Sequence, residues 1–263
     1  MKSIAIIDYI IRWLSTYLEE AEAKGFVIGI SGGIDSAVAS TLAARTGLPL
    51  LCVEMPINQD RIQVSRARDH SAFLKEKYPN TRTHEVDLTP VFDELIKALP
   101  EAGNMRQKVL SLTNVRARLR MTTLYYFSGL HDYLVVGTGN KVEDFGIGFF
   151  TKYGDGGVDL SPIADLTKSQ VYKLGEEMGI IKSIMSASPT DGLWADNRTD
   201  EEQIGASYPE LEKAMDVSGD ESALGARQRE VLKIYRSLRN TNLHKLLPVP
   251  VCTLPKDLLS DPE

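Results

Sequence analysis

A short glycine-rich segment that follows an apolar run is the part of this 263-residue chain best suited to bind phosphate. Residues 26–30 are apolar apart from one glycine, and Ser31-Gly32-Gly33-Ile34-Asp35-Ser36 follows directly. This pattern predicts a buried strand, a turn and the first turn of a helix. Backbone N–H groups at a helix N-terminus attract anions, and glycines let the backbone close around them. We therefore expect a phosphate cradle here.

The cradle is not of the Walker type, because no lysine ends it in the G-x-x-x-x-G-K-[ST] spacing. Its sequence resembles S-G-G-x-D-S, the pyrophosphate loop of the N-type ATP pyrophosphatases. By that resemblance the chain splits ATP between the α and β phosphates and leaves AMP on a substrate. An ordinary glycine-rich turn between a strand and a helix is the alternative interpretation.

A second polar segment, residues 137–144, follows the strand predicted at residues 133–138. Because the carboxyl ends of parallel strands meet at one edge of a sheet, we expect Glu143 to lie near Asp35. Two carboxylates beside a polyphosphate suit Mg²⁺, which prefers oxygen ligands and phosphate bridges. The sequence thus predicts Asp35 and Glu143 as metal ligands, with Asp144 as the alternative to Glu143. Solvated acids at the start of a helix are the competing interpretation.

Residues 148–162 have the composition of an ordered binding loop. Four glycines, two aspartates, a lysine and three aromatic residues occur there within fifteen positions. Such a stretch forms helices and strands poorly, but it suits a binding site, with a lysine for phosphate or carboxylate and an aromatic ring for a planar base. A loop with only a structural role is the alternative.

The overall composition excludes several classes of protein. A hydrophobic fraction of 43% and a charged fraction of 25% are typical of a globular chain with a full core. The net charge of −6 argues against nucleic-acid partners and against anionic membranes, and no apolar run approaches the ~20 residues of a membrane span. Cys52 and Cys252 lack metal-binding spacing, so we expect a protein of the reducing cytoplasm without disulfides.

Strand and helix patterns alternate along the chain. Helical patterns occupy residues 3–24, 37–43, 60–77, 89–99 and 105–130, and strand patterns occupy residues 26–30, 50–53, 83–88 and 133–138. Gly25 is expected to end the first helix, which covers either the sheet or a partner subunit. The alternation predicts an α/β fold, a Rossmann-like parallel sheet with helices on both faces, in a single domain that spans residues 1–263.

Taken together, the motifs resemble those of the ammonia-dependent NAD synthetases, which have an adenine nucleotide alpha-hydrolase-like fold. The likeness covers nearly the whole chain, from the first helix to His244-Lys245. It is carried by the cradle, by Gly137-Thr138-x-Asn140-Lys141-x-Glu143, by residues 148–156 and by Ser188-Pro189-Thr190. The resemblance implies ATP-dependent adenylation of deamido-NAD, release of pyrophosphate, and displacement of AMP by ammonia to give NAD, the final step of NAD biosynthesis.

The same resemblance implies a role for individual residues. The catalytic residues would be Asp35, Lys168 and Thr190, and the metal would be Mg²⁺, held by Asp35 and Glu143. The ATP-binding residues would be Gly29, Ile30, Ser31, Gly32, Gly33, Ile34, Asp35, Ser36, Thr138, Lys168 and Thr190. The residues that contact deamido-NAD would be Arg118, Lys152, Asp159, His244 and Lys245.

The resemblance also implies a homodimer with the dinucleotide at the subunit interface. The chain has no room for the amidase domain of glutamine-using relatives, so ammonia is the expected donor unless a separate glutaminase delivers it. GMP synthesis and tRNA thiolation are alternative activities, and a non-catalytic nucleotide sensor is the alternative from another class. The sequence leaves adenosine contacts near Glu54 and Met55 open, and residues 196–202 are predicted to form a mobile surface loop.

Overall fold

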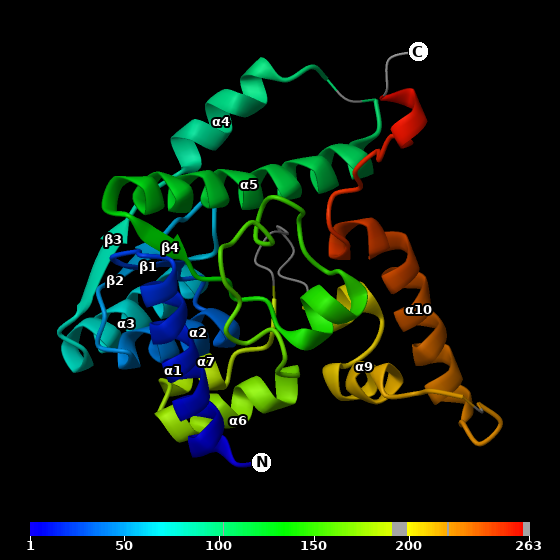
Figure 1. The fold of residues 1–263 in the computed structure, drawn as a ribbon, viewed down its shortest axis with the longest axis horizontal. Helices are drawn as coiled ribbons and strands as arrows, with labels where there is room; N and C mark the ends of the chain where they lie inside the picture. Colours follow the sequence, from blue (N-terminus) through cyan, green and yellow to red (C-terminus); the bar gives the residue numbers. More distant parts are fainter. Residues whose placement is uncertain (102, 191–198, 220, 260–263) are drawn as a thin grey trace.

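The computed structural model describes residues 1–101, 103–190, 199–219 and 221–259. Its centre is a four-stranded sheet of order β3-β2-β1-β4 in which all pairs are parallel (Figure 1). The strands are β1 (Gly25–Gly29), β2 (Leu50–Glu54), β3 (Thr81–Glu85) and β4 (Tyr133–Val135). This arrangement confirms the predicted parallel α/β fold.

The order of the strands creates a switch point at β1. The chain builds β2 and β3 on one side of β1 and then crosses over to place β4 on the other side. Loops that leave β1 and β4 therefore diverge in opposite directions at the carboxyl edge, and such crevices bind ligands in open α/β sheets. Both polar segments singled out in the sequence leave the sheet at this point.

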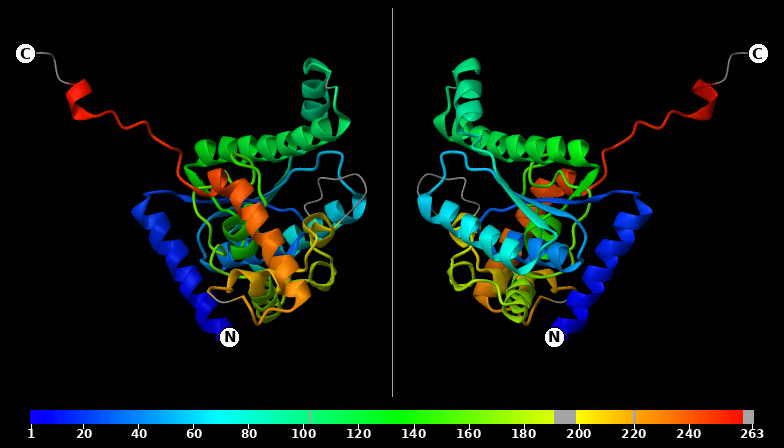
Figure 2. Two further views of the ribbon diagram at one scale, coloured as in Figure 1. Left: turned by 90° about the vertical axis from the view of Figure 1, so that its right-hand side faces the viewer. Right: turned by 90° about the vertical axis from the view of Figure 1, so that its left-hand side faces the viewer.

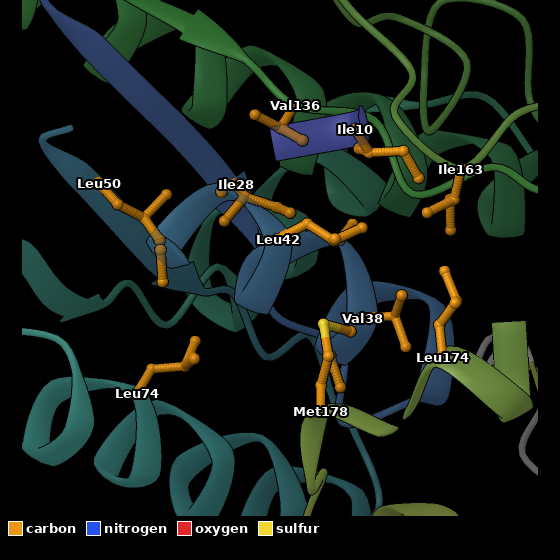
Figure 3. Packing of buried hydrophobic residues seen from close by; sticks show 14 of the residues in the cluster. Ile10, Ile28, Val38, Leu42, Leu50, Leu74, Val136, Ile163, Leu174 and Met178 are labelled. Atoms are coloured by element: carbon orange, nitrogen blue, oxygen red, sulfur yellow. The ribbon is translucent and has the colours of Figure 1, made fainter. Parts of the chain in front are cut away.

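One face of the sheet carries the largest apolar cluster. Buried side chains of five helices meet those of the strands there, and Ile28, Leu42 and Leu174 are each fully buried among them (Figure 3). The helices on this face are α1 (Ser3–Glu20), α2 (Ile34–Arg45), α3 (Arg61–Lys77), α6 (Lys168–Met178) and α7 (Lys182–Met185). Helix α2 is buried nearly all round, which explains its run of small residues, because only small side chains let neighbouring elements approach on every side.

Two helices, α4 (Thr89–Ala98) and α5 (Met105–His131), serve the opposite face. Phe92 of α4 is fully buried, and its ring lies 4.8 Å from the guanidinium carbon of Arg116 on α5. Helix α5 lies across the sheet and contacts β1 and β4 (Figure 2). Helices thus cover both faces, as the sequence predicts.

A third cluster forms beside the sheet. Val142 and Ile147 belong to η1, a π-helix at Lys141–Ile147, and they pack against apolar residues of the helices at Tyr208–Met215 and Ala226–Leu246. The remaining elements are α8 (Asp200–Ile204), α9 (Tyr208–Met215), α10 (Ala226–Leu246) and a 3₁₀ turn, η2 (Lys256–Leu258). Within the residues described, no helix has the length and apolarity needed to span a membrane.

The expectation for Gly25 was wrong. Helix α1 ends at Glu20 with Ala21 as its cap, and Gly25 is instead the first residue of β1. A Cβ at Gly25 would lie 2.5 Å from the carbonyl oxygen of Pro49 and 2.7 Å from the ring of Tyr133. The glycine is required because neighbouring chain segments approach its backbone too closely for a side chain.

Residues 196–202 are only partly covered by the structure, because positions 191–198 lie outside the described residues. From Thr199 onward the prediction of a surface loop was wrong. Thr199 caps α8, and Asp200 is buried at 5% exposure. A capping box, invisible to hydropathy patterns, starts this helix.

His70 gives the fold a pH dependence. The side chain is fully buried on α3, its Nε2 lies 3.0 Å from Ser40 Oγ, and within the described chain its Nδ1 has no partner. Burial lowers the pKa of His70 from 6.5 to about 4. Between these two pH values His70 is mostly protonated in the unfolded chain and mostly neutral in the folded chain. The free energy of unfolding should therefore fall as pH drops from about 6.5 to about 4, with no contribution from His70 above that range.

We predict that His70→Gln flattens this part of the stability profile, because glutamine still bonds Ser40 but does not titrate. The loss of stability between pH 7 and pH 4 should be smaller in the variant by about 3 kcal/mol. Urea unfolding at several pH values measures the difference. Parallel profiles for the two proteins would show that His70 does not cause the pH dependence.

Candidate active site

A pocket opens at the carboxyl edge of β1 and β4, where the switch point predicts one. Its walls come from the loops after β1, β2 and β4, from the start of α3, from α5 and from the segment after α7. The predicted ATP-binding residues all line it, namely Gly29, Ile30, Ser31, Gly32, Gly33, Ile34, Asp35, Ser36, Thr138, Lys168 and Thr190. The fold therefore brings together residues that lie more than a hundred positions apart in the chain.

The loop after β1 is held in shape by its own serines. Ser36 Oγ donates to the carbonyl of Gly33 at 3.1 Å and accepts from the backbone N–H of Ser31 at 3.2 Å. Gly33 is the N-cap of α2, and its N–H donates to Ser31 Oγ at 3.2 Å. These bonds fix the loop at the positive end of α2, where an anion gains from the helix dipole.

At the centre of the pocket, a buried lysine joins the two loops. Lys168 is 4% exposed, and its Nζ lies 2.5 Å from Asp35 Oδ2 and 2.8 Å from Glu143 Oε1. Burial alone would lower the pKa of Lys168, but the two carboxylates outweigh it and raise the pKa above the ordinary value. The ammonium group therefore stays charged at neutral pH.

The two carboxylates respond differently to the same burial. Burial raises the pKa of Asp35, and the nearby Glu143 carboxylate adds to that effect against the opposing pull of Lys168. Burial also opposes ionisation of Glu143, but Lys168 and the hydroxyl of Tyr208 outweigh it, so the pKa of Glu143 is lowered. Of these two carboxylic acids, Glu143 therefore ionises more readily than Asp35.

Two further side chains keep these carboxylates in place. Asn140 is fully buried, its Nδ2 donates to Asp35 Oδ1 at 3.1 Å, and its Oδ1 accepts from the N–H groups of Val142 and Glu143. Tyr208 donates a short hydrogen bond to Glu143, and its ring lies 4.8 Å from Lys168 Nζ. Asn140 thus caps η1 and ties it to the first loop, and π-helical turns are frequent at functional sites.

Asp144, the alternative metal ligand, also lines the pocket. Burial, together with the carboxylate of Asp155, raises the pKa of Asp144 well above its ordinary value. A Cβ at Gly139 would fall on the Asp144 carboxylate, so Gly139 makes room for it. Asp144 differs from Glu143 in position, because Glu143 shares the Lys168 ammonium group with Asp35.

The carboxylates fit Mg²⁺ only in company with other oxygens. Asp35 and Glu143 point oxygens at one position, now taken by Lys168 Nζ, and both are hard ligands. Among the residues described, no group of three or more side chains is arranged to hold a metal by itself. Mg²⁺ suits such a site, because it binds through one or two carboxylates together with phosphate oxygens and water.

None of the residues predicted to contact deamido-NAD lines the pocket. Four of them are linked by hydrogen bonds between the chain segments to which they belong. Arg118 donates to the carbonyl of Lys152 at 3.3 Å, and Lys152 Nζ donates to the carbonyl of His244 at 3.0 Å. Lys245 Nζ donates to the carbonyl of Phe150 at 2.6 Å. These four residues therefore form one chain of contacts between α5, the loop at residues 148–157 and the end of α10.

Asp159 is separate from that group. Its Oδ1 accepts from the Tyr125 hydroxyl at 2.9 Å, and its Oδ2 accepts from the N–H of Val135 at 2.7 Å. Both oxygens thus fix the edge of β4. The substrate contact predicted for Asp159 stays a prediction.

Sequence reasoning missed Tyr208 as a member of the site. Nothing near it in sequence marks it, because it stands at the start of α9, a short helix with an ordinary capping box. For Asn140 the sequence did contain a signal, because asparagine is one of the preferred residues at the N-cap of a helix. Contacts between segments far apart in the chain decide both roles.

Gly32 provides a test of the loop. It has φ +79°, and a Cβ there would lie 2.7 Å from the carbonyl oxygen of Gln63 and 3.0 Å from the N–H of Ala67. Gly47 has a similar φ of +76° but open space around it. We predict that Gly32→Ala weakens ATP binding roughly tenfold or more, because α3 must move off the loop and charge-assisted bonds are lost.

The matched variant Gly47→Ala carries the same left-handed strain of about 1 kcal/mol and should keep full ATP affinity. Calorimetric titration with ATP and thermal unfolding of both variants separate the two effects. Equal ATP affinity in both variants would show that close packing of α3 on the loop is unimportant.

Comparison with known proteins places these features in one family. The NAD synthase family model matches residues 6–248. A curated relative, the NH3-dependent NAD(+) synthetase of Syntrophomonas wolfei, is 35% identical over 98% of this chain and 99% of its own length.

Solved structures agree. An NMN synthetase from Francisella tularensis has a TM-score of 0.84 at 29% identity and covers 97% of this chain and 100% of its own. The NH3-dependent NAD synthetase of Campylobacter jejuni has a TM-score of 0.72 at 25% identity and covers 96% of this chain and 100% of its own. On sequence and structure together, this chain belongs to the NAD synthase family.

Proposed function

We propose that the pocket is the active site of an ammonia-dependent NAD synthetase. The enzyme adenylates the nicotinate carboxylate of deamido-NAD with ATP, releases pyrophosphate, and then lets ammonia displace AMP to form NAD. The observation that supports this most strongly is Lys168, buried between Asp35 of the phosphate loop and Glu143 of the loop after β4. A charged lysine at that position suits chemistry that builds negative charge beside the loop.

Each step of the reaction places a demand on the pocket. Attack of a carboxylate on the α-phosphorus adds charge to the non-bridging oxygens and to the departing pyrophosphate. Lys168 and the N–H groups at the start of α2 neutralise that charge, while Thr138 and Thr190, which also line the pocket, bond ATP. The acyl-adenylate must then meet ammonia and not water, so exclusion of water from the pocket protects it.

We propose Mg²⁺ as the metal, held by Asp35 and Glu143 together with phosphate oxygens. Its chemistry is to neutralise phosphate charge and orient the α-phosphate. Lys168 would then move off one carboxylate toward the phosphates, since one position cannot hold both cations. The geometry supports both ligands, because Asp35 and Glu143 already direct oxygens at one cationic group.

For deamido-NAD we propose the group formed by Arg118, Lys152, His244 and Lys245, together with the separate Asp159. In this structure Arg118, Lys152 and Lys245 donate to backbone carbonyls, and cationic donors bond more strongly to the oxygens of an anionic phosphate group. Burial lowers the pKa of Lys245, against the pull of Asp155 and Asp144. An anionic ligand beside Lys245 would counter that lowering, because a nearby negative charge favours the ammonium form.

A homodimer is also proposed. Helix α5 exposes Met105, Leu110, Tyr126 and Leu130, and the segment after α10 runs away from the body with Val251 at 83% exposure (Figure 2). Apolar surfaces of this kind on neighbouring elements are typical of interfaces. A second copy over α5 would stand beside Arg118, so the dinucleotide site would lie at the interface.

Two expectations from the sequence stay proposals. One is that residues 1–263 form a single catalytic domain, which the packing of η1 on both α9 and α10 supports. The other is a location in the reducing cytoplasm, with which the free thiols of Cys52 and Cys252 agree.

A second candidate substrate is nicotinate mononucleotide. It is favoured by the TM-score of 0.84 to the Francisella NMN synthetase, against 0.72 to the Campylobacter enzyme. The chemistry at the phosphate loop would be the same, since both substrates present a nicotinate carboxylate. The two candidate substrates differ in whether the enzyme must also accommodate the adenylate half of a dinucleotide.

Turnover decides between them. We predict that the enzyme with ATP, Mg²⁺ and ammonium releases pyrophosphate and forms NAD from deamido-NAD, with little product from nicotinate mononucleotide or when glutamine replaces ammonium. Asp35→Asn should lower kcat roughly 100-fold or more, because the bond to Lys168 weakens and a ligand is lost. Faster turnover of nicotinate mononucleotide than of deamido-NAD would change the substrate assignment. If neither substrate led to release of pyrophosphate, the proposed amidating function would be refuted.

The metal ligands can be separated by isosteric amides. Glu143→Gln should raise the Mg²⁺ concentration for half-maximal rate roughly tenfold or more, whereas Asp144→Asn should shift it less, because Asp35 and Glu143 direct oxygens at one cationic position. Steady-state rates over a Mg²⁺ series measure this. A larger shift in Asp144→Asn than in Glu143→Gln would transfer the ligand role to Asp144.

A further inference from the structure

Arg66, on α3, is a pocket residue that the function outlined above does not use. It is half-buried, lines the pocket, and donates from Nε to the carbonyl of Gly32 at 3.3 Å. We propose that Arg66 binds the β and γ phosphates of ATP and holds pyrophosphate after the adenylation step. This inference rests on the proposed function, because it assigns one more group to the same ATP site.

The packing of α3 explains why Arg66 stands at the loop. A Cβ at Gly32 would lie 2.7 Å from the carbonyl oxygen of Gln63, 3.0 Å from the N–H of Ala67 and 3.3 Å from Cβ of Arg66. The second turn of α3 therefore rests on the phosphate loop with no side chain between them. The stem of Arg66 begins beside the loop, and the bond to Gly32 fixes the direction of the guanidinium group.

The remaining donors of Arg66 are uncommitted. Only its Nε has a hydrogen-bond partner among the described residues, so both terminal nitrogens keep their N–H groups for a ligand. Arg68, two positions later, differs, because its Nε and Nη2 both donate to Glu85 at 2.7 Å. A planar guanidinium with two parallel N–H groups matches the geometry of phosphate oxygens.

The mixture of acidic and basic residues in the pocket lining bears on the role of Arg66. Six of the described lining residues are acidic, namely Asp35, Glu54, Glu143, Asp144, Asp155 and Asp200, against the basic residues Arg66, Arg120 and Lys168. Lys168 is paired with two of these carboxylates, and Arg120 donates to the carbonyl of Met55 and to Gln59 Oε1. A polyphosphate entering this pocket meets Arg66 as the basic group with the most donors to spare.

Arg66→Gln tests the assignment, with Arg61→Gln as its matched control. Glutamine can still donate to Gly32 but carries no charge. Arg61 stands on the same helix, is exposed and does not line the pocket. Calorimetric titrations of each protein with ATP, with inorganic pyrophosphate and with AMP give the affinities.

We expect Arg66→Gln to weaken binding of ATP and pyrophosphate roughly 10- to 100-fold, and to leave AMP affinity within about twofold. Arg61→Gln should bind all three as the wild type does. Unchanged pyrophosphate affinity in Arg66→Gln would overturn the proposal, and so would an equal loss for AMP, which has no β or γ phosphate.

Arg66→Lys keeps the charge without the planar fork, and we expect it to fall between wild type and Arg66→Gln. It also carries the test if Arg66→Gln does not fold. Then wild-type affinity for pyrophosphate in Arg66→Lys would overturn the bidentate contact.

None of these titrations contains deamido-NAD. A wild-type enzyme that binds pyrophosphate through Arg66 but forms no amide would therefore refute the proposed function alone, and normal pyrophosphate binding by Arg66→Gln in an active enzyme would refute this inference alone.

Discussion

The burial of one ammonium group between two carboxylates is the interaction on which the site depends. Lys168, at the first position of α6, reaches Asp35 of the loop after β1 and Glu143 of η1. None of the three would remain ionised at such burial without the others, because an isolated charge in a poorly solvated interior is expensive. Their mutual pairing fixes three separate elements around one point, and it does so where the sheet topology already opens a crevice.

The fold supports this pairing from both sides. Helix α2 carries Asp35 in its first turn, and the fully buried cluster beneath it leaves that turn little room to move. On the other side, Asn140 and Tyr208 hold Glu143, and Tyr208 belongs to the satellite cluster formed by η1, α9 and α10. Breaking a buried pair costs more than its formation gains. The geometry therefore resists distortion until a ligand with its own charges enters.

The fold class and the phosphate loop were predictable from local patterns, whereas Thr138, Lys168 and Thr190 were reached through the family resemblance. Short strand patterns, most of them apolar, alternate with helical segments and indicate parallel strands and crossover helices, and the carboxyl-edge rule then places Asp35 and Glu143 together. Tyr208 and the free donors of Arg66 were not predictable. Their roles depend on which residues of α9 and α3 face the pocket, and helix packing angles decide that.

The sequence by itself determined which chemical groups the site contains, namely a glycine-rich anion-binding loop and acidic residues after two strands. It also determined family membership, because the spacing of those motifs is specific. The tertiary structure decided the state of each group. Lys168 and Tyr208, from distant segments, outweigh burial and lower the pKa of Glu143, whereas burial and Asp155 raise the pKa of the adjacent Asp144. A side chain's charge depends on its surroundings in three dimensions, and only folding brings Lys168 and Tyr208 to one acid and Asp155 to the other.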